Sequence, residues 1–260
     1  FVVFLLAFVG VGIYSSTRKK STQEDYLVSG RDIPPWMMAL SAMSTNNSGF
    51  MFIGMIGMTY TQGISSMWIM VGWILGDYMV WRLVNPRLRQ MSEERKLSTI
   101  PAFLANRPGH KQDWTVRRLA GIVTLIALGI YAAAQLKAGS KALYVLFGWD
   151  MSIGAVIGAV IVAIYCFSGG IRASIWTDAV QALVMVFAML VLVIVAIVEA
   201  GGVVMLYEQL YHIDPMLVNF TPPDLKFGFL MFFLGWFAAG IGVAGQPHIM
   251  IRAMTLDKAE

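Results

Sequence analysis

Long runs of apolar residues, separated by polar or glycine- and proline-rich connections, dominate this sequence. Runs of about 20 apolar residues are long enough to cross the hydrocarbon core of a bilayer as helices. Of the 260 residues 58% are hydrophobic and 13% are charged, and that charged fraction is about half of what an ordinary soluble domain carries. Backbone polar groups in hydrocarbon need partners within the protein, and helices provide them. The sequence therefore predicts an all-α membrane protein in contact with the lipid bilayer.

Seven apolar runs qualify as membrane-spanning helices. In chain order they cover residues 1–16, 36–61, 64–84, 117–146, 151–168, 173–199 and 227–253. Long charged connections are expected at 17–35 and 84–116, a tight turn at SGGIRA (168–173), and a longer loop at 201–226. No linker indicates a second domain, so we expect one domain over residues 1–260.

The basic residues predict the orientation, because Lys and Arg near the ends of spans are retained on the cytoplasmic side. Placing both charged connections, the SGGIRA turn and the C-terminal end inside puts 16 of the 19 Lys and Arg there, and leaves only Lys137, Lys141 and Lys226 outside. The net charge of +4 is thus a topology signal for a multi-pass protein of the plasma (inner) membrane. It does not form the continuous basic face that a nucleic-acid partner requires.

Two of the apolar runs contain residues that weaken a helix. The second run carries SAMSTNNSGF at 41–50, and short polar side chains of this kind compete for backbone hydrogen bonds. The seventh run carries GWFAAGIGVAGQPHIM at 235–250, in which Pro247 has no amide hydrogen to donate. We predict interruptions near residues 44–48 and 239–245. The alternative is that these small residues pack helices together, as is common in membranes.

The spacing of the two interruptions is informative. Five spans, an odd number, run from the second to the sixth, so a repeat that starts again at the seventh enters the membrane from the opposite face. Paired interrupted spans in two inverted halves indicate the binding site of a secondary transporter near the bilayer midplane. No motif combines a nucleophile, a base and an orienting group, so we expect neither an enzyme nor a bound cofactor.

Several motifs together resemble the sodium:solute symporter family, closest to its sodium/proline symporter branch. They are DYLVSGRDIPPW, ALSAMSTNNSGFMFIG, STIPAFLANR, SGGIRASIWTDAVQALVM and GQPHIMIRAM, in this order. The resemblance implies the five-plus-five inverted-repeat fold: an extra first helix (1–16), a complete first repeat (36–199) and the first helix of a truncated second repeat (227–253). It also predicts that this chain is an N-terminal fragment of a longer transporter.

The resemblance implies positions for the coupling ion. Sodium is a hard cation that takes several oxygen ligands, and the carbonyls of Ser44 and Asn47 at the second-span break are expected to supply some of them. No other metal is expected. Asp178 is the only acid in the sixth span before its last residue, Glu199, and an ionisable group at membrane depth indicates an ion path. We expect Asp178 to bind sodium on its exit path or at a second position. The alternative is a structural pair with Arg172.

The solute is expected between the two interruptions. Its candidate contacts are Asn46, Ser48, Phe50, Tyr131, Gln135, Trp236 and Val243, although each aromatic among them is also typical of core packing. Tyr131 matches a Tyr of the proline carriers. Those carriers have an Asp at the position of Asn46, and a Trp and a Tyr at the positions of Ala239 and Val243.

Two functions fit these motifs. The first is sodium-driven symport of a small organic solute across the plasma membrane, with an amino acid such as proline as the expected solute and carboxylates, sugars and vitamins as alternatives. The second is a membrane sensory input module joined to a histidine kinase. The chain after Glu260 would distinguish them, because a transporter continues with further spans and a sensor with soluble signalling domains.

Overall fold

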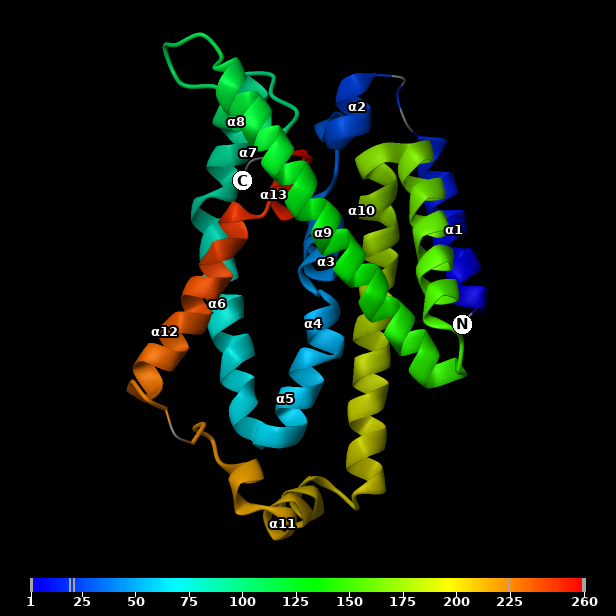
Figure 1. The fold of residues 1–260 in the computed structure, drawn as a ribbon, viewed down its shortest axis with the longest axis vertical. Coiled ribbons are helices and arrows are strands. Elements are labelled where there is room, and N and C mark those ends of the chain that lie inside the picture. Colours follow the sequence, from blue (N-terminus) through cyan, green and yellow to red (C-terminus); the bar gives the residue numbers. More distant parts are fainter. Residues whose placement is uncertain (1, 19, 21, 224, 259–260) are drawn as a thin grey trace. The chain divides into compact units, whose positions relative to one another are not determined.

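The computed structural model of the chain describes residues 2–18, 20, 22–223 and 225–258, and these are helical almost throughout (Figure 1). The α-helices are α1 (Val2–Ser16), α2 (Gln23–Val28), α3 (Pro35–Asn46), α4 (Gly49–Phe52), α5 (Gly54–Gln62), α6 (Met67–Leu83), α7 (Asn85–Glu94), α8 (Ile100–Leu104), α9 (Trp114–Phe147), α10 (Met151–Glu199), α11 (Val203–Ile213), α12 (Gly228–Ile241) and α13 (Pro247–Ala253). Short 3₁₀ helices are η1 (Ser29–Arg31), η2 (Gly63–Ser66), η3 (Pro215–Val218) and η4 (Gly242–Gly245). The predicted all-α class is confirmed.

Four helical segments are long and apolar enough to cross a membrane by length and composition. They are Gly49–Glu94, Trp114–Phe147, Gly169–Glu199 and Gly228–Gly245, and shorter apolar helices cover Val3–Ser16 and Met151–Ile164. Each predicted span therefore coincides with helical structure. The chain is an integral membrane protein.

Helix α10 contains the predicted SGGIRA turn. Helical structure runs through the turn, but Gly170 has φ 58° and ψ −145°, far from helical values. The helix reverses its direction at this point (Figure 1). A Cβ at Gly170 would collide with the backbone and ring of Tyr26. The fifth and sixth spans are therefore the two arms of one helix that is bent at a glycine.

The connection 201–226 differs from the prediction of a loop. It contains α11 and η3, because apolar residues recur along α11 at the spacing of one helical face. The two charged connections also contain short helices, namely α2, α7 and α8. Polar composition between spans therefore did not mean irregular structure.

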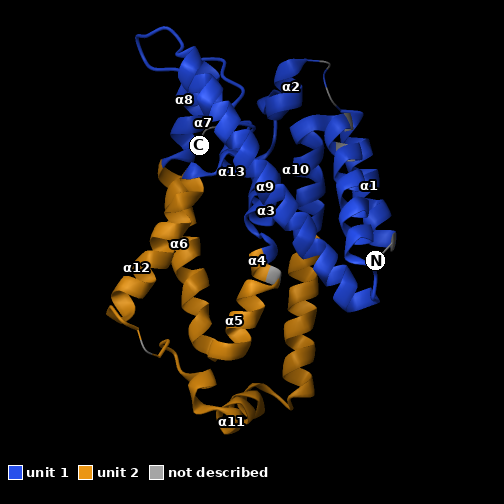
Figure 2. Ribbon diagram, in the orientation of Figure 1, with its two compact units in different colours: residues 1–49, 84–182, 245–260 blue, residues 50–83, 183–244 orange. Residues whose placement is uncertain are grey.

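The chain forms two compact units, each assembled from segments far apart in the sequence (Figure 2). Unit 1 comprises residues 1–49, 84–182 and 245–260. Unit 2 comprises residues 50–83 and 183–244.

In unit 2, glycines bring α6 and α12 into close contact. A Cβ on Gly76 of α6 would collide with the carbonyl of Phe237, and a Cβ on Gly240 of α12 would collide with the carbonyl of Trp73. Small residues let membrane helices approach backbone to backbone, where dispersion and weak polar contacts hold them together. Gly240 in the seventh run therefore serves helix packing, which the sequence left as an alternative.

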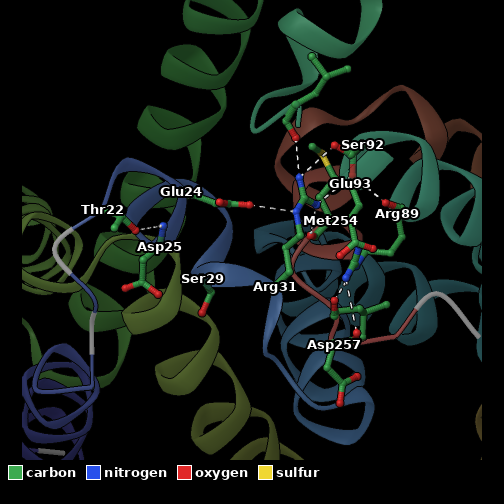
Figure 3. A network of polar contacts seen from close by, with 12 residues as sticks. Thr22, Glu24, Asp25, Ser29, Arg31, Arg89, Ser92, Glu93, Met254 and Asp257 are labelled. Atoms are coloured by element: carbon green, nitrogen blue, oxygen red, sulfur yellow. Dashed lines mark hydrogen bonds and ion pairs between the residues drawn. The ribbon is translucent and has the colours of Figure 1, made fainter. Parts of the chain in front are cut away.

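In unit 1, the buried side chain of Arg31 joins three segments (Figure 3). Nη1 donates to Ser92 Oγ at 3.0 Å and to the carbonyl of Met254 at 2.9 Å, and Nη2 donates to the carbonyl of Leu97 at 2.8 Å. Burial, together with the charge of Arg89, lowers the pKa of the Arg31 guanidinium below its usual value. The group stays charged, since arginine is not deprotonated in proteins, and five oxygen partners, including the Glu24 carboxylate and the Ser92 carbonyl, offset its desolvation.

A second buried arginine, Arg172, contacts the segment 25–32 that contains Arg31. Arg172 contacts Asp25 Oδ1 at 2.5 Å and Asp32 Oδ1 at 3.0 Å, and donates to the carbonyl of Ser29 at 2.8 Å. The backbone of this segment turns at Ser29, Gly30 and Arg31, which all have φ between 55° and 58°. This left-handed turn costs free energy for the two residues with a Cβ, and the two arginine networks stabilise it.

We predict that Gly240→Ala destabilises the protein by about 1–3 kcal/mol, because the added methyl group overpacks the contact between α6 and α12. Thermal unfolding in detergent micelles measures this loss as a lower midpoint. Gly235→Ala in the same helix is the matched control, since a Cβ there meets nothing within 4 Å and alanine favours the helix. Equal midpoints for the two variants would contradict the packing role.

Candidate functional site

The second span is interrupted inside the range that the sequence predicts. Helix α3 ends at Asn46, Asn47 has φ −76° and ψ 90°, and the helix resumes at Gly49. Ser44 lies in the last turn of α3, where the final carbonyls of a helix lack partners within that helix. Such carbonyls are suitable ligands for a hard cation. Of the two predicted sodium ligands, Ser44 therefore lies in the last turn of α3 and Asn47 lies directly after the helix ends.

Gln135 of α9 binds the backbone at this interruption. Its Oε1 accepts a hydrogen bond from the Gly49 amide at 2.7 Å. A Cβ at Gly49 would lie 2.6 Å from Ala138 Cβ, so glycine is required for this close approach to α9. The first amides of a helix have no partner within it, and Gln135 satisfies one of them for α4. Gln135 is a predicted solute contact, and in the structure it also holds the interruption.

The seventh span is also interrupted. Helix α12 ends at Ile241, the 3₁₀ helix η4 follows, and Gln246 has φ −103° and ψ 101° before α13 begins at Pro247. This position overlaps the predicted range 239–245. Pro247 stands at the first position of α13, where its missing amide hydrogen costs no helical hydrogen bond.

Three pairs of polar residues, each four positions apart on one helix, converge around Asp178. They are Ser41 and Thr45 of α3, Ser174 and Asp178 of α10, and His248 and Arg252 of α13. Asp178 Oδ2 accepts from Arg252 Nη2 at 2.7 Å and from Ser41 Oγ at 2.9 Å. The hydroxyls of Thr45 and Ser174 lie 3.4 Å from the same oxygen. Residues four apart share a helix face, which is why five of these side chains meet in unit 1, while His248 contributes its backbone carbonyl to Arg252.

Arg252 completes this cluster. Its Nε donates to Ser41 Oγ at 3.0 Å, its Nη2 also donates to Ser174 Oγ at 3.2 Å, and its Nη1 donates to the carbonyl of His248 at 2.5 Å. The side chains of Arg252 and Asp178 are only 10% and 15% exposed. The cluster thus gathers one carboxylate and three hydroxyls, all oxygen ligands of the type that sodium prefers, around a guanidinium that neutralises the carboxylate.

The alternative that Asp178 pairs with Arg172 is wrong. Arg172 contacts Asp25 and Asp32, and Asp178 contacts Arg252. The physical reason is the turn at Gly170: Arg172 lies next to it and reaches the segment 22–32, whereas Asp178 lies almost two turns further along α10.

Tyr131 of α9, a predicted solute contact, lies against His248 in unit 1. The two ring centroids are 5.0 Å apart and the planes are tilted by 36°. The side-chain nitrogens of His248 are buried and have no hydrogen-bond partner among the described residues. His248 therefore packs as an aromatic ring and offers two nitrogens for a polar group that enters beside Tyr131.

The remaining predicted solute contacts are divided between the units. Asn46 and Ser48 border the interruption in unit 1, and Phe50, Trp236 and Val243 belong to unit 2. Trp236 packs on Gly72 of α6, and Val243 is fully buried. Their role in binding solute stays a prediction.

Sequence reasoning missed Arg252, Ser41 and Ser174. A detectable signal existed for Arg252, because a cation inside an apolar run needs an anionic or oxygen-rich partner, and Asp178 is an acid inside the sixth span. Ser41 and Ser174 each stand four residues before a polar residue, Thr45 and Asp178, on the same helix face. Nothing in the sequence alone indicated that these faces meet.

Comparison with known proteins agrees with this geometry. The model of the sodium:solute symporter family matches residues 26–260. The chain is 33% identical to the high-affinity proline transporter PutP of Bacillus subtilis, over 95% of this chain and 51% of that protein. It is 31% identical to the sodium/proline symporter of Escherichia coli, over 99% of this chain and 50% of that protein. The chain thus spans about half the length of these curated relatives.

A solved structure shares the fold. It is the substrate-bound outward-open state of a Na⁺-coupled sialic acid symporter, which superposes with a TM-score of 0.81 at 22% identity. The superposition covers 99% of this chain and 53% of that one. The predicted transporter fold is therefore confirmed for the part that this chain contains.

We predict strong coupling between Asp178 and Arg252. Arg252→Met alone should destabilise the full-length protein by about 3–5 kcal/mol, because it leaves a buried carboxylate without its cation. The double variant Asp178→Asn/Arg252→Met should lose less stability than the sum of the losses of the two single variants. Thermal unfolding of the wild type and the three variants in detergent measures these losses.

The control for this cycle is Glu93→Gln, which removes the charge from an exposed partner of Arg89. It should change stability by less than about 1 kcal/mol. Additive effects of the Asp178 and Arg252 changes would show that the pair is not energetically linked.

Proposed function

Because the chain belongs to the sodium:solute symporter family, we propose that it is part of a carrier that couples the entry of sodium to the uptake of a small organic solute across the plasma membrane. The observation that carries this proposal is the interruption of α3 at Asn47 and Ser48, held by Gln135. Interrupted helices supply backbone groups at membrane depth, and this is where secondary transporters bind ions and solutes. The neighbouring carboxylate and hydroxyls around Asp178 support the same conclusion.

The proposed ion chemistry divides between two places. Carbonyls at Ser44 and Asn47 bind sodium without adding a negative charge to the site. The carrier without sodium therefore has no buried, uncompensated anion at this position. Asp178 binds sodium either on the exit path of the ion or at a second sodium position. Arg252 already contacts the carboxylate, so a sodium ion that arrives there competes with the guanidinium, and binding stays reversible.

For the solute we propose an amino acid, with proline as the first to be tested. Relatives over nearly the whole chain are named for proline, and Tyr131 offers a phenol beside the buried ring of His248. Ala239 and Val243 replace larger aromatic residues of the proline carriers, and Asn46 replaces an acid. These differences favour a solute pocket with more room and less negative charge than in those carriers.

We predict that the full-length protein, reconstituted in vesicles, accumulates its solute only when a sodium gradient is directed inward. The panel consists of labelled proline, other amino acids, carboxylates, sugars and vitamins. Replacing sodium with potassium on both sides should abolish accumulation, because the larger ion fits a different oxygen cage. Uptake that is equally fast in potassium, or no uptake of any solute, would contradict the proposal.

We predict that Asp178→Asn raises the sodium concentration for half-maximal uptake about tenfold, since losing a charge-assisted contact costs about 1.5 kcal/mol or more. The solute concentration for half-maximal uptake at saturating sodium should change much less. Asp150→Asn is the control: Asp150 is an exposed acid that accepts from the Ser152 amide, and Asn caps a helix equally well. Unaltered sodium activation in Asp178→Asn would leave this acid a structural role only.

A further inference from the structure

Helix α11 begins directly after a membrane-spanning helix and runs in a different direction. Gly201 and Gly202 have φ of 82° and 111°, and the Gly202 amide donates to the carbonyl of Ile197 at 2.8 Å, which closes the end of α10. A left-handed glycine pair at a helix end turns the chain sharply. Figure 1 shows α11 crosswise to the last part of α10. Helix α11 therefore starts at the level where the span ends.

The two faces of α11 differ in chemistry. At 100° per residue, Val203, Val204, Leu206, Tyr207, Leu210, Tyr211 and Ile213 share an arc of about half the circumference. Glu208, Gln209 and His212 lie on the opposite side, with Met205 among them. Most of the apolar arc is uncovered among the described residues: Val204 is 73% exposed, Val203 65%, and Tyr207 and Tyr211 50% each, whereas Leu206 and Leu210 are half-buried.

The segment after α11 is anchored to unit 2. Trp68 of α6 donates from Nε1 to the carbonyl of Phe220 at 2.7 Å. Gly63 of η2 lies so close to Leu217 of η3 that a Cβ would collide with the Leu217 backbone. Residues 214–220 are therefore fixed against the turn between α5 and α6. With α10 at one end and this anchor at the other, α11 is held across the end of unit 2.

The surface of α10 that adjoins α11 is apolar and exposed within the described residues. Ile194, Val195 and Val198 are 50% to 69% exposed on the candidate span Gly169–Glu199, and hydrocarbon suits an apolar surface of this kind on a spanning helix. The apolar arc of α11 continues this surface beyond Gly202. Its two tyrosines suit the boundary between headgroups and acyl chains, where an aromatic ring meets both apolar and polar surroundings.

We propose that α11 lies in the outer interface of the bilayer, with Val203, Val204, Tyr207 and Tyr211 inserted toward the acyl chains and Glu208 and His212 toward water. The partner of this surface is the lipid bilayer itself. Helix α11 contains neither Lys nor Arg, so its attachment depends on apolar burial and on its two tethers, and needs no anionic lipid.

The test is spin-label accessibility in the full-length protein, reconstituted in phosphatidylcholine vesicles. The chain has one cysteine, Cys166, so Cys166→Ala, with replacement of any cysteine outside these 260 residues, provides the background. Single changes Val204→Cys and Tyr207→Cys sample the apolar arc, and Glu208→Cys and His212→Cys sample the polar face. Leu190→Cys in α10 is the reference for hydrocarbon.

We expect the ratio of oxygen to nickel-chelate accessibility at 204 and 207 to be at least about threefold higher than at 208 and 212, since oxygen concentrates where apolar residues are buried in lipid. The values at 204 and 207 should lie between those at 212 and at 190. The proposal is wrong if all four sites are equally accessible to the nickel chelate. It is also wrong if 204 and 207 are immobilised and shielded from both reagents, because protein would then cover the arc.

Discussion

The requirement that every backbone polar group has a partner in hydrocarbon shapes this structure more than any other constraint. It explains why the described chain is helical almost throughout, and why the interruption of the second span is accompanied by a specific contact. The interruption after Asn46 is held by the Gln135 carboxamide on the Gly49 amide. Such a contact allows carbonyls to be available at membrane depth without a large cost in stability, which is the condition for binding an ion there.

Buried charges obey the same requirement. Arg31, Arg172 and Arg252 are each surrounded by carbonyls, hydroxyls or carboxylates from segments far apart in the sequence. A guanidinium has five donors in a rigid plane, so one side chain can join several segments at once. In unit 1 the first charged connection, the turn of α10 and the end of α13 are all linked in this way. The arginines that are expected on the cytoplasmic side therefore also stabilise the fold.

The placement of Asp178 shows where sequence reasoning was limited. Its place in the sixth span predicts a role in sodium binding, which stays a prediction, and the alternative partner, Arg172, was wrong. The nearest opposite charge along a helix is a weak guide once a glycine bends that helix. Partner choice was decided by α13 packing against α3, which brings Arg252 and Ser41 to the carboxylate.

The apolar runs, the interrupting residues and the basic connections determined the class, the spans and the family of this protein, because these properties depend on local composition and on order along the chain. Tertiary structure alone decided which helix faces meet. It placed Ser41, Ser174 and Arg252 around Asp178, and it set Gln135 against the interruption. Each of these outcomes depends on contacts between residues that are distant in sequence, and the packing free energy of the whole unit selects such contacts.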